Sequence, residues 1–274
     1  MIRDLRLFAL AALVACFGSF GFPSPADAQQ PAPPRHIGVL LGAFSPEEKV
    51  PQAFRQGLLG AGYAEGRDVV IEWRSANGDY DRVSELAAEL VQRKVEAIVV
   101  ESTPAAQAAK RATSTIPIVM AIVADPVGSC LVASLAHPGG NVTGLSMMIT
   151  DLSAEQLQLL KETVPRLTRV AVLRNPANPW HTKVVEDLKA VAPSLSIELS
   201  VVGMRTPREI DPAFSAARRA HAEAMYIMPD AFFFTHRARI LKLASKARLP
   251  VMYGERHFAD RGLFQSLRPD LFGQ

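Results

Sequence analysis

Cysteine and the aromatic residues are scarce in this chain. Its 274 residues include two cysteines, and phenylalanine, tryptophan and tyrosine together make up 7% of it. Only Cys130 lies beyond the first 28 residues, so that part cannot form an internal disulfide, and we interpret Cys130 as a small buried apolar residue. Because Ala, Val, Leu and Ile dominate instead, the composition favours helices packed on sheets over an all-β sandwich.

A strong excess of charge of either sign is also missing. The chain has 30 Lys and Arg against 27 Asp and Glu, a formal net charge of +3. The basic residues are scattered between acidic ones and form no stripe. The sequence therefore gives no support to nucleic-acid binding.

The common sequence motifs of nucleotide-binding, nucleophilic and metal sites are absent from the sequence. There is no Gly-x-Gly-x-x-Gly after an expected strand, no P-loop lysine motif and no Gly-x-Ser-x-Gly elbow. The six histidines lack the spacings of metal ligands. We therefore expect no catalytic residue, no cofactor and no metal. The carboxylates Asp125, Asp230 and Glu255 are expected to bind a ligand's ammonium or hydroxyl group.

Residues 1–28 have the features of an export signal. Arg3 and Arg6 precede an almost wholly apolar run, and Ala26 and Ala28 occupy the small-residue positions of a cleavage site. This predicts a periplasmic protein that begins at Gln29, with residues 29–35 as an extended leader. An alternative is a lipoprotein attached through Cys16, because "LVAC" resembles a lipoprotein box.

From residue 36 onwards, apolar runs typical of strands alternate with helical patterns, and the order repeats after Gly144. "VEAIVVES" corresponds to "AEAMYIMP", and "TIPIVMAI" to "RLPVMYGE". The expected strands are 36–43, 68–73, 96–102 and 117–124 in the first half, and 169–175, 196–202, 223–229 and 250–255 in the second. Continuous apolar strands that alternate with helices predict parallel sheets covered on both faces. The fold class is thus α/β, with two Rossmann-like lobes.

The segment "HPGGNVTG" (137–144) separates the two halves. No strand precedes its glycines, so a phosphate-binding loop is not expected there. Asn141 and Thr143 match a glycosylation sequon, which we regard as incidental in a chain with a bacterial type of signal. We expect Gly139 and Gly140 to form a turn into a connecting strand at 141–146, which leads from one lobe to the other.

Ligands of parallel α/β sheets bind outside the carboxyl ends of the strands, and this rule selects the candidate binding residues. Asn175 follows one such strand. The other candidates are Phe44, Ser45, Ser102, Thr103 and Asp125 in the first lobe, and Asn178, Asp230, Tyr253 and Glu255 in the second. Ser45, Thr103 and Asn178 stand where helix N-caps belong, so capping is an alternative role for each of them.

Several quoted stretches together carry a family likeness. "AFRQGLLGAGYAEGRDVVIEW", "IPIVMAIVADPVGSCLVASLAHPGGNVTG" and "RVAVLRNPANP" resemble ABC-transporter substrate-binding proteins of the tryptophan/tyrosine-type uptake family. The likeness extends from residue 36 to about residue 262. It implies a type I periplasmic-binding fold, in which two lobes joined by a hinge close over a small molecule and then dock on a permease in the inner membrane.

The resemblance also implies roles for matching positions. Ser45, Thr103, Asp125, Asn178 and Asp230 would contact an amino acid or related carboxylate. The helix N-terminus at Thr103 suits a carboxylate, and Asp125 and Asp230 suit an ammonium group. Phe44 and Tyr253 would enclose an apolar or aromatic side chain. Lobe 1 is expected at 36–147 with 262–274 returning to it, and lobe 2 at 148–261.

The C-terminal part departs from the family pattern. Family members have a "GGL-x-SYG" strand followed by a further helix and a last hinge crossing, whereas this chain reads "RGLFQSLRPDLFGQ" (261–274). We therefore expect the last hinge crossing to be missing and the stability to be reduced. Besides a transport receptor, two alternatives remain at this point: a ligand-binding sensory module for a membrane receptor, and a truncated remnant without function.

Overall fold

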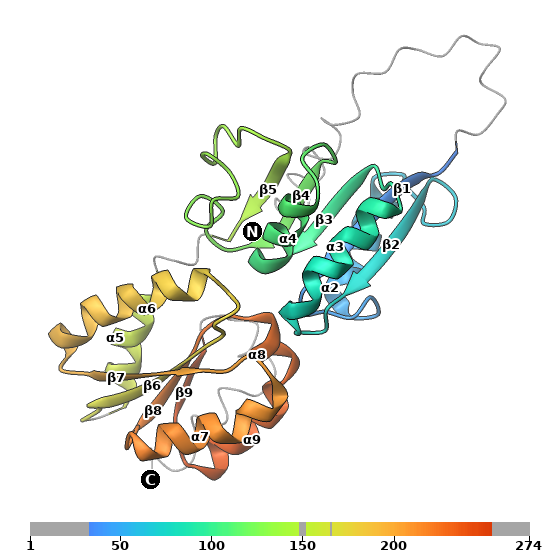
Figure 1. The fold of residues 1–274 in the computed structure, drawn as a ribbon. Coiled ribbons are helices and arrows are strands. Elements are labelled where there is room, and N and C mark those ends of the chain that lie inside the picture. The colour runs from blue at the N-terminus through green and yellow to red at the C-terminus, as the bar shows by residue number, and fades with distance from the viewer. Residues whose placement is uncertain (1–32, 148–151, 165, 254–274) are drawn as a thin grey trace, which may run out of the picture. The chain divides into compact units, whose positions relative to one another are not determined.

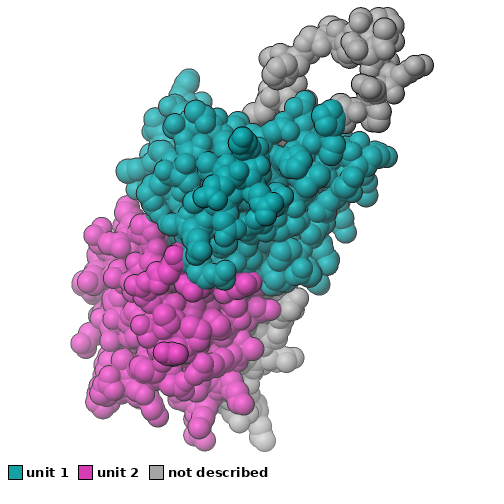
Figure 2. All heavy atoms as spheres, turned by 45° about the vertical axis from the view of Figure 1, so that its right-hand side comes forward, with its two compact units in different colours: residues 1–76, 82–146 teal, residues 77–81, 147–274 magenta. Residues whose placement is uncertain are grey.

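The computed structural model describes residues 33–147, 152–164 and 166–253. Contacts divide the chain into two compact units, coloured teal and magenta in Figure 2. Unit 1 comprises residues 1–76 and 82–146, and unit 2 comprises residues 77–81 and 147–274. The predicted export signal and the predicted return of 262–274 lie outside the described residues. No helix of the described ranges is long and apolar enough to cross a membrane.

Unit 1 is a five-stranded parallel sheet with the strand order β2-β1-β3-β4-β5 (Figure 1). Its strands are β1 (Arg35–Leu41), β2 (Val69–Ser75), β3 (Ala97–Glu101), β4 (Ile118–Val123) and β5 (Val142–Ser146). Its helices are α2 (Lys49–Gly60), α3 (Val83–Gln92) and α4 (Thr103–Ala112). A short 3-10 turn, η1 (Tyr80–Arg82), precedes α3.

Helices cover both faces of this sheet because successive side chains of a strand point to opposite faces. Val39 and Leu41 of β1 pack in one cluster with Leu58 of α2. On the other face, Gly38 lies under α3. A Cβ atom added to Gly38 would lie 3.0 Å from both methyl carbons of Leu90, so the absence of a side chain lets α3 approach the strand.

The segment 137–144 leads into the edge strand β5, which lies beside β4. The side-chain amide of Asn141 donates to the carbonyl oxygens of Thr113 (3.1 Å) and Ile116 (2.8 Å), and thereby fixes the turn before β4. Gly144 has φ +131°, and an added Cβ atom would lie 2.3 Å from the Met120 carbonyl oxygen. Glycine is therefore required at this position by conformation and by space.

Unit 2 is a four-stranded parallel sheet with the strand order β7-β6-β8-β9 (Figure 1). Its strands are β6 (Arg169–Arg174), β7 (Glu198–Gly203), β8 (Ala224–Ile227) and β9 (Val251–Tyr253). Its helices are α5 (Ser153–Thr163), α6 (Trp180–Val191), α7 (Ile210–Arg219), α8 (Ala231–Thr235) and α9 (Arg237–Lys246), with 3-10 turns η3 (Ala192–Leu195) and η4 (Pro207–Glu209).

The central strands β6 and β8 are the most buried part of unit 2. All four residues of β8 are buried, as are the four inner residues of β6. Phe214 of α7, Phe232 and Phe233 of α8 and Ile240 of α9 pack in one core cluster. The nine strands predicted from the sequence are all present, with boundaries that differ by a few residues. The α/β prediction with two parallel sheets is confirmed.

Candidate functional site

The strand orders bring the predicted binding residues to one edge of each sheet. In unit 1, β1, β3 and β4 are neighbours, so the loops that begin after these strands lie next to each other. In unit 2 the same holds for β6, β8 and β9. The carboxyl ends of parallel strands share an edge, and this edge is where ligands of such sheets bind.

Asp230, directly before α8, is the centre of a buried polar network in unit 2. Its Oδ1 atom accepts hydrogen bonds from Nδ2 of Asn175 (3.0 Å) and from the backbone amide of Phe232 (2.9 Å). Its Oδ2 atom accepts from Nδ2 of Asn178 at 3.0 Å. The Asp230 side chain has no exposed surface. The carboxylate thus caps α8 and holds both asparagines, and its predicted contact with a ligand's ammonium group stays a prediction.

Every polar group of Asn175, in the backbone and in the side chain, makes a hydrogen bond. Its backbone amide donates to Nδ1 of His181 (2.8 Å), and its carbonyl oxygen accepts from the amide of Asn178 (3.0 Å). Its side-chain Oδ1 accepts from the amide of Ala177 at 2.9 Å, while Nδ2 binds Asp230. The loop between β6 and α6 is therefore held in one conformation by four bonds to a single residue.

His181, in the first turn of α6, completes the network and gave no signal in the sequence. Its ring is fully buried, and its Nε2 atom lies 2.9 Å from the carbonyl oxygen of Pro229. Burial lowers the pKa of the imidazole, and the nearby Asp230 carboxylate opposes that shift. The partners of His181 are mostly backbone atoms, whose positions depend on the fold rather than on a residue pattern.

Two side-chain atoms beside this network are buried and have no hydrogen-bond partner among the described residues. They are the carbonyl oxygen Oδ1 of Asn178 and the indole nitrogen Nε1 of Trp180. Asn178 is 6% exposed and Trp180 4%. A buried polar atom without a partner destabilises a fold by about 1–3 kcal/mol, so these atoms call for a specific explanation.

In unit 1, Ser102 and Thr103 join β3 to α4. Ser102 has φ 150°, in the region that favours glycine, and its hydroxyl oxygen accepts from the amide of Ala105 at 3.3 Å. The Thr103 hydroxyl donates to the carbonyl oxygen of Ala124 at 3.3 Å. Pro104 has no amide hydrogen. The side chains of Ser102 and Thr103 are thus used within the protein, and the predicted carboxylate contact at Thr103 would depend on its backbone amide.

Glu101, the last residue of β3, is a buried carboxylate that the sequence analysis missed. Its Oε2 atom accepts from the backbone amides of Gly42 (2.9 Å) and Ala43 (3.0 Å). It thereby ties the end of β3 to the loop after β1, which carries Phe44 and Ser45. A glutamate that ends an apolar strand was the available signal, since a buried carboxylate needs donors nearby.

The remaining predicted binding residues of unit 1 make contacts within their own loops or with the core of the unit. Ser45 donates from its amide to Oε1 of Glu48 at 3.1 Å, and Phe44 packs against the core that contains Leu58. Asp125 has φ 34°, and its Oδ1 atom accepts from the amide of Gly128 at 2.8 Å. These hydrogen bonds fix the geometry of the two loops. The contacts of these residues with a ligand stay predictions.

In unit 2, Tyr253 ends β9, is partly buried and packs against the core formed by α7, α8 and α9. Its predicted contact with an apolar ligand group is likewise untested. Glu255 lies outside the described residues.

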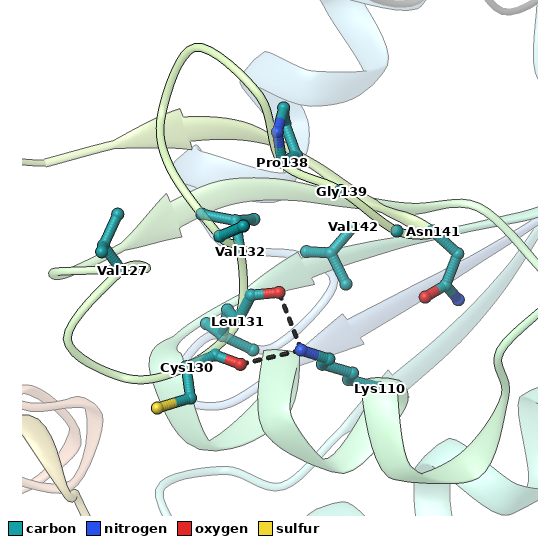
Figure 3. A pocket seen from close by; sticks show the side chains of 11 residues that line it. Lys110, Val127, Cys130, Leu131, Val132, Pro138, Gly139, Asn141 and Val142 are labelled. Carbon is teal, nitrogen blue, oxygen red and sulfur yellow. Dashed lines mark hydrogen bonds between the residues drawn. The ribbon is translucent and has the colours of Figure 1, made fainter.

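A surface hollow of about 410 Å³ in unit 1 contains none of the predicted binding residues (Figure 3). Lys110 donates from Nζ to the carbonyl oxygens of Cys130 (2.8 Å) and Leu131 (3.0 Å) at this hollow. The prediction that Cys130 is buried is wrong. Cys130 is exposed because it occupies a turn with φ 56° in the loop after β4. In the part of the chain that the structure describes, no three His, Cys, Asp or Glu residues are grouped to hold a metal ion.

Comparisons with known proteins agree with this architecture. The sequence model of the family described as "ABC transporter substrate binding protein" matches residues 46–272. The tyrosine-binding protein of Clostridioides difficile is 29% identical over 222 residues, which are 81% of this chain and 64% of that protein. The chain thus spans less than two thirds of the length of this relative.

Two solved structures share the fold. One is an ABC domain from Streptococcus pneumonia in complex with L-Trp, with a TM-score of 0.73, 24% identity and coverage of 84% of this chain and 77% of the other. The second is a conserved domain protein from Vibrio cholerae, with a TM-score of 0.73, 28% identity and coverage of 85% and 81%. The fold is the type I periplasmic-binding fold. The chain belongs to the family of ABC transporter substrate-binding proteins.

Proposed function

We propose that this chain is the extracytoplasmic binding protein of an ABC importer. It captures an amino acid or a related small carboxylate and delivers it to a permease in the inner membrane. The family consists of binding proteins rather than enzymes, and its members act outside the cytoplasm. The predicted export signal supports a periplasmic location, with attachment through Cys16 as the alternative.

The observation that carries the proposal is the hydrogen bonding of the Asn178 side chain. Its amide nitrogen is held by Asp230, while its carbonyl oxygen is buried without a partner among the described residues. An ammonium group that donates to this oxygen would remove the penalty of an unmade hydrogen bond. In this proposal Asp230 keeps Asn178 in place, and its negative charge favours a cation nearby.

The ligand's carboxylate is assigned to unit 1, at the N-terminus of α4. The amide of Thr103 and the helix dipole favour an anion there. Lys110 and Arg111 lie at the opposite end of the helix and complement its dipole. We expect the ligand side chain to be apolar or aromatic, because the aromatic residue Phe44 lies in the loop after β1 of unit 1 and Tyr253 ends β9 of unit 2.

The names of similar proteins narrow the first ligands to test. A relative is named for tyrosine, and a protein of the same fold was solved with L-Trp. The decisive experiment is isothermal titration calorimetry of the chain from Gln29 with L-tyrosine, L-tryptophan and L-leucine, and with benzoate as a ligand without an ammonium group. A thermal-shift series provides an independent readout.

Binding of one of the amino acids supports the proposal. A ligand at a hundred times its Kd adds about 2.7 kcal/mol of apparent stability. A cooperatively folded protein that binds none of these compounds would contradict the proposed ligand class. Equal affinity for benzoate and for the amino acids would contradict the assignment of an ammonium contact to Asn178.

A further inference from the structure

We propose that His181 is a positioning residue of unit 2: its neutral imidazole joins the loop after β6 to the loop after β8, and protonation of the ring separates the two loops. The effect on ligand affinity rests on the function proposed above. The effect on the loops concerns unit 2 alone and can be measured without a ligand.

The hydrogen bonds of His181 define the tautomer and the protonation state of its ring. The Pro229 carbonyl oxygen, 2.9 Å from Nε2, can only accept, so Nε2 carries the hydrogen. The backbone amide of Asn175, 2.8 Å from Nδ1, can only donate, so Nδ1 carries a lone pair. Only the neutral imidazole with its hydrogen on Nε2 satisfies both contacts.

The two contacts belong to different loops that meet only in the folded sheet. Asn175 directly follows β6, and Pro229 lies two residues beyond β8. The strands are neighbours, with Leu173 opposite Ile227. His181 therefore acts as a cross-link between the loop that carries Asn178 and the loop that carries Asp230.

Burial of the ring away from water disfavours a positive charge on it, and this effect outweighs the attraction of the Asp230 carboxylate. The ring is stacked on Phe233 at a centroid distance of 6.4 Å and lies 5.3 Å from Trp180. The charged groups near it are Asp230, with Oδ2 at 3.8 Å from Nε2, and Arg174, whose positive charge opposes protonation. The Asp230 carboxylate is already occupied by two side-chain amides and one backbone amide.

Protonation would place two donors against each other. A hydrogen on Nδ1 would face the amide hydrogen of Asn175 across a contact of 2.8 Å, and one of the two groups would have to move. Asn175 also holds Asp230 and the amide of Asn178, so its displacement would loosen the site. The lowered pKa of the buried imidazole agrees with a ring held in its neutral form.

The first test uses the wild-type protein without ligand. Nitrogen-15 NMR of the histidine rings, recorded between pH 7.5 and 5, reports which ring nitrogen carries the hydrogen. We expect the His181 ring to have a pyridine-type Nδ1 and a pyrrole-type Nε2, and this form to persist below pH 6.5, the ordinary pKa of the group. The variant His181→Gln assigns the signal. A hydrogen on Nδ1, or titration at an ordinary pKa, would overturn the proposal.

The second test measures L-tyrosine binding by calorimetry between pH 5 and 7, where the α-carboxyl and α-amino groups of the ligand do not titrate. His181→Gln keeps a donor for Pro229 but cannot titrate. We expect its Kd at pH 7 to rise about tenfold, which corresponds to the loss of one positioning hydrogen bond. In the wild type, Kd should rise as the pH falls below the lowered pKa of His181, and this rise should be absent in His181→Gln.

His221→Asn is the matched control, because His221 is an exposed histidine of unit 2 whose φ of 49° asparagine tolerates. It should keep the wild-type Kd and pH profile. A His181→Gln variant with the wild-type Kd and pH profile would contradict the positioning role. If wild-type protein binds none of the tested amino acids at any pH, the proposed ligand class fails, while the ring NMR still decides the role of His181.

Discussion

The side-chain amide of Asn178 donates a hydrogen bond to Asp230 over 3.0 Å, although the two residues are 52 positions apart in the sequence. The bond connects the loop after β6 with the start of α8. It orients the asparagine so that its nitrogen is occupied and its carbonyl oxygen remains for another donor. Asp230 therefore supports the candidate site through Asn178.

Replacing Asp230 with asparagine should show this supporting role. Asp230→Asn keeps the size of the side chain but puts a donor against an amide that also donates. We expect the free energy of unfolding to fall by about 2 kcal/mol, because a buried charge-assisted contact becomes unsatisfied. Urea unfolding followed by circular dichroism measures this change, and L-tyrosine affinity should fall in the same variant.

Asp187→Asn provides the control for Asp230→Asn. Asp187 pairs with Lys183 at 2.6 Å on the surface of α6, one helical turn apart. Loss of such an exposed pair should change stability by less than about 0.5 kcal/mol. Equal effects of the two variants would show that the buried network contributes no more than a surface ion pair.

The buried carboxylate of Glu101 leads to a second prediction. In Glu101→Gln, the contacts to the amides of Gly42 and Ala43 lose the assistance of a negative charge. We expect a loss of about 1 kcal/mol in stability, together with faster hydrogen exchange of these two amides. Glu89→Gln is the control, because Glu89 pairs with Arg74 at a more exposed position of the same unit. Unchanged exchange at Gly42 and Ala43 would show that Glu101 does not hold this loop.

The pH dependence of stability between pH 5 and 7 should reveal the histidines of unit 2. Burial lowers the pKa of His181 and of His236 from the ordinary value of 6.5. As the pH falls below 6.5, the unfolded chain takes up protons that the folded chain does not, so the free energy of unfolding decreases. A single fully mismatched histidine gives a slope of about 1.4 kcal/mol per pH unit.

Urea unfolding at several pH values measures this slope. His181→Gln should reduce it and leave the part that belongs to His236. The lowered pKa of Glu223, which comes mainly from the backbone amide of Thr168, affects stability only at more acidic pH. A slope that is the same in the wild type and in His181→Gln would mean that the folded protein protonates His181 as readily as the unfolded chain.

The strands of both units could be predicted from the sequence because each is a short, local run of apolar residues. β6 is buried over its four inner residues and β8 over its whole length, as expected for short apolar runs in the middle of a sheet. The positions of Asp230 and Asn178 could also be predicted, because ligands bind at the carboxyl edge of a parallel sheet and both residues follow a strand there.

The bonds that these residues make could not be predicted. His181 binds two backbone atoms, one of them 48 residues away, and no residue pattern encodes that contact. A glutamate at the end of an apolar strand indicated a buried carboxylate at Glu101, but its partners, the backbone amides of Gly42 and Ala43, have no sequence signal. The burial of Cys130 was predicted wrongly because residue type alone does not show that it lies in an exposed turn after β4.

The glycines of the segment 137–144 allow a sharp comparison of two positions. Gly144 has φ +131°, and an added Cβ atom would lie 2.3 Å from the backbone oxygen of Met120 and 2.5 Å from its nitrogen. Gly140 has nothing within 4 Å of the same added atom. Gly144→Ala must therefore displace β5 from β4, whereas Gly140→Ala meets no obstacle.

We expect Gly144→Ala to lower the free energy of unfolding by about 2 kcal/mol or more, since both strain and a backbone clash oppose the methyl group. Gly140→Ala should stay within about 0.5 kcal/mol of the wild type. Thermal unfolding of both variants, with hydrogen exchange at the amide of Ile118 as a local readout, separates the two positions, because that amide donates to the carbonyl oxygen of Asn141 at 2.7 Å. Equal stability of both variants would show that β5 can detach from β4 without loss, and that the turn rather than the strand fixes the end of unit 1.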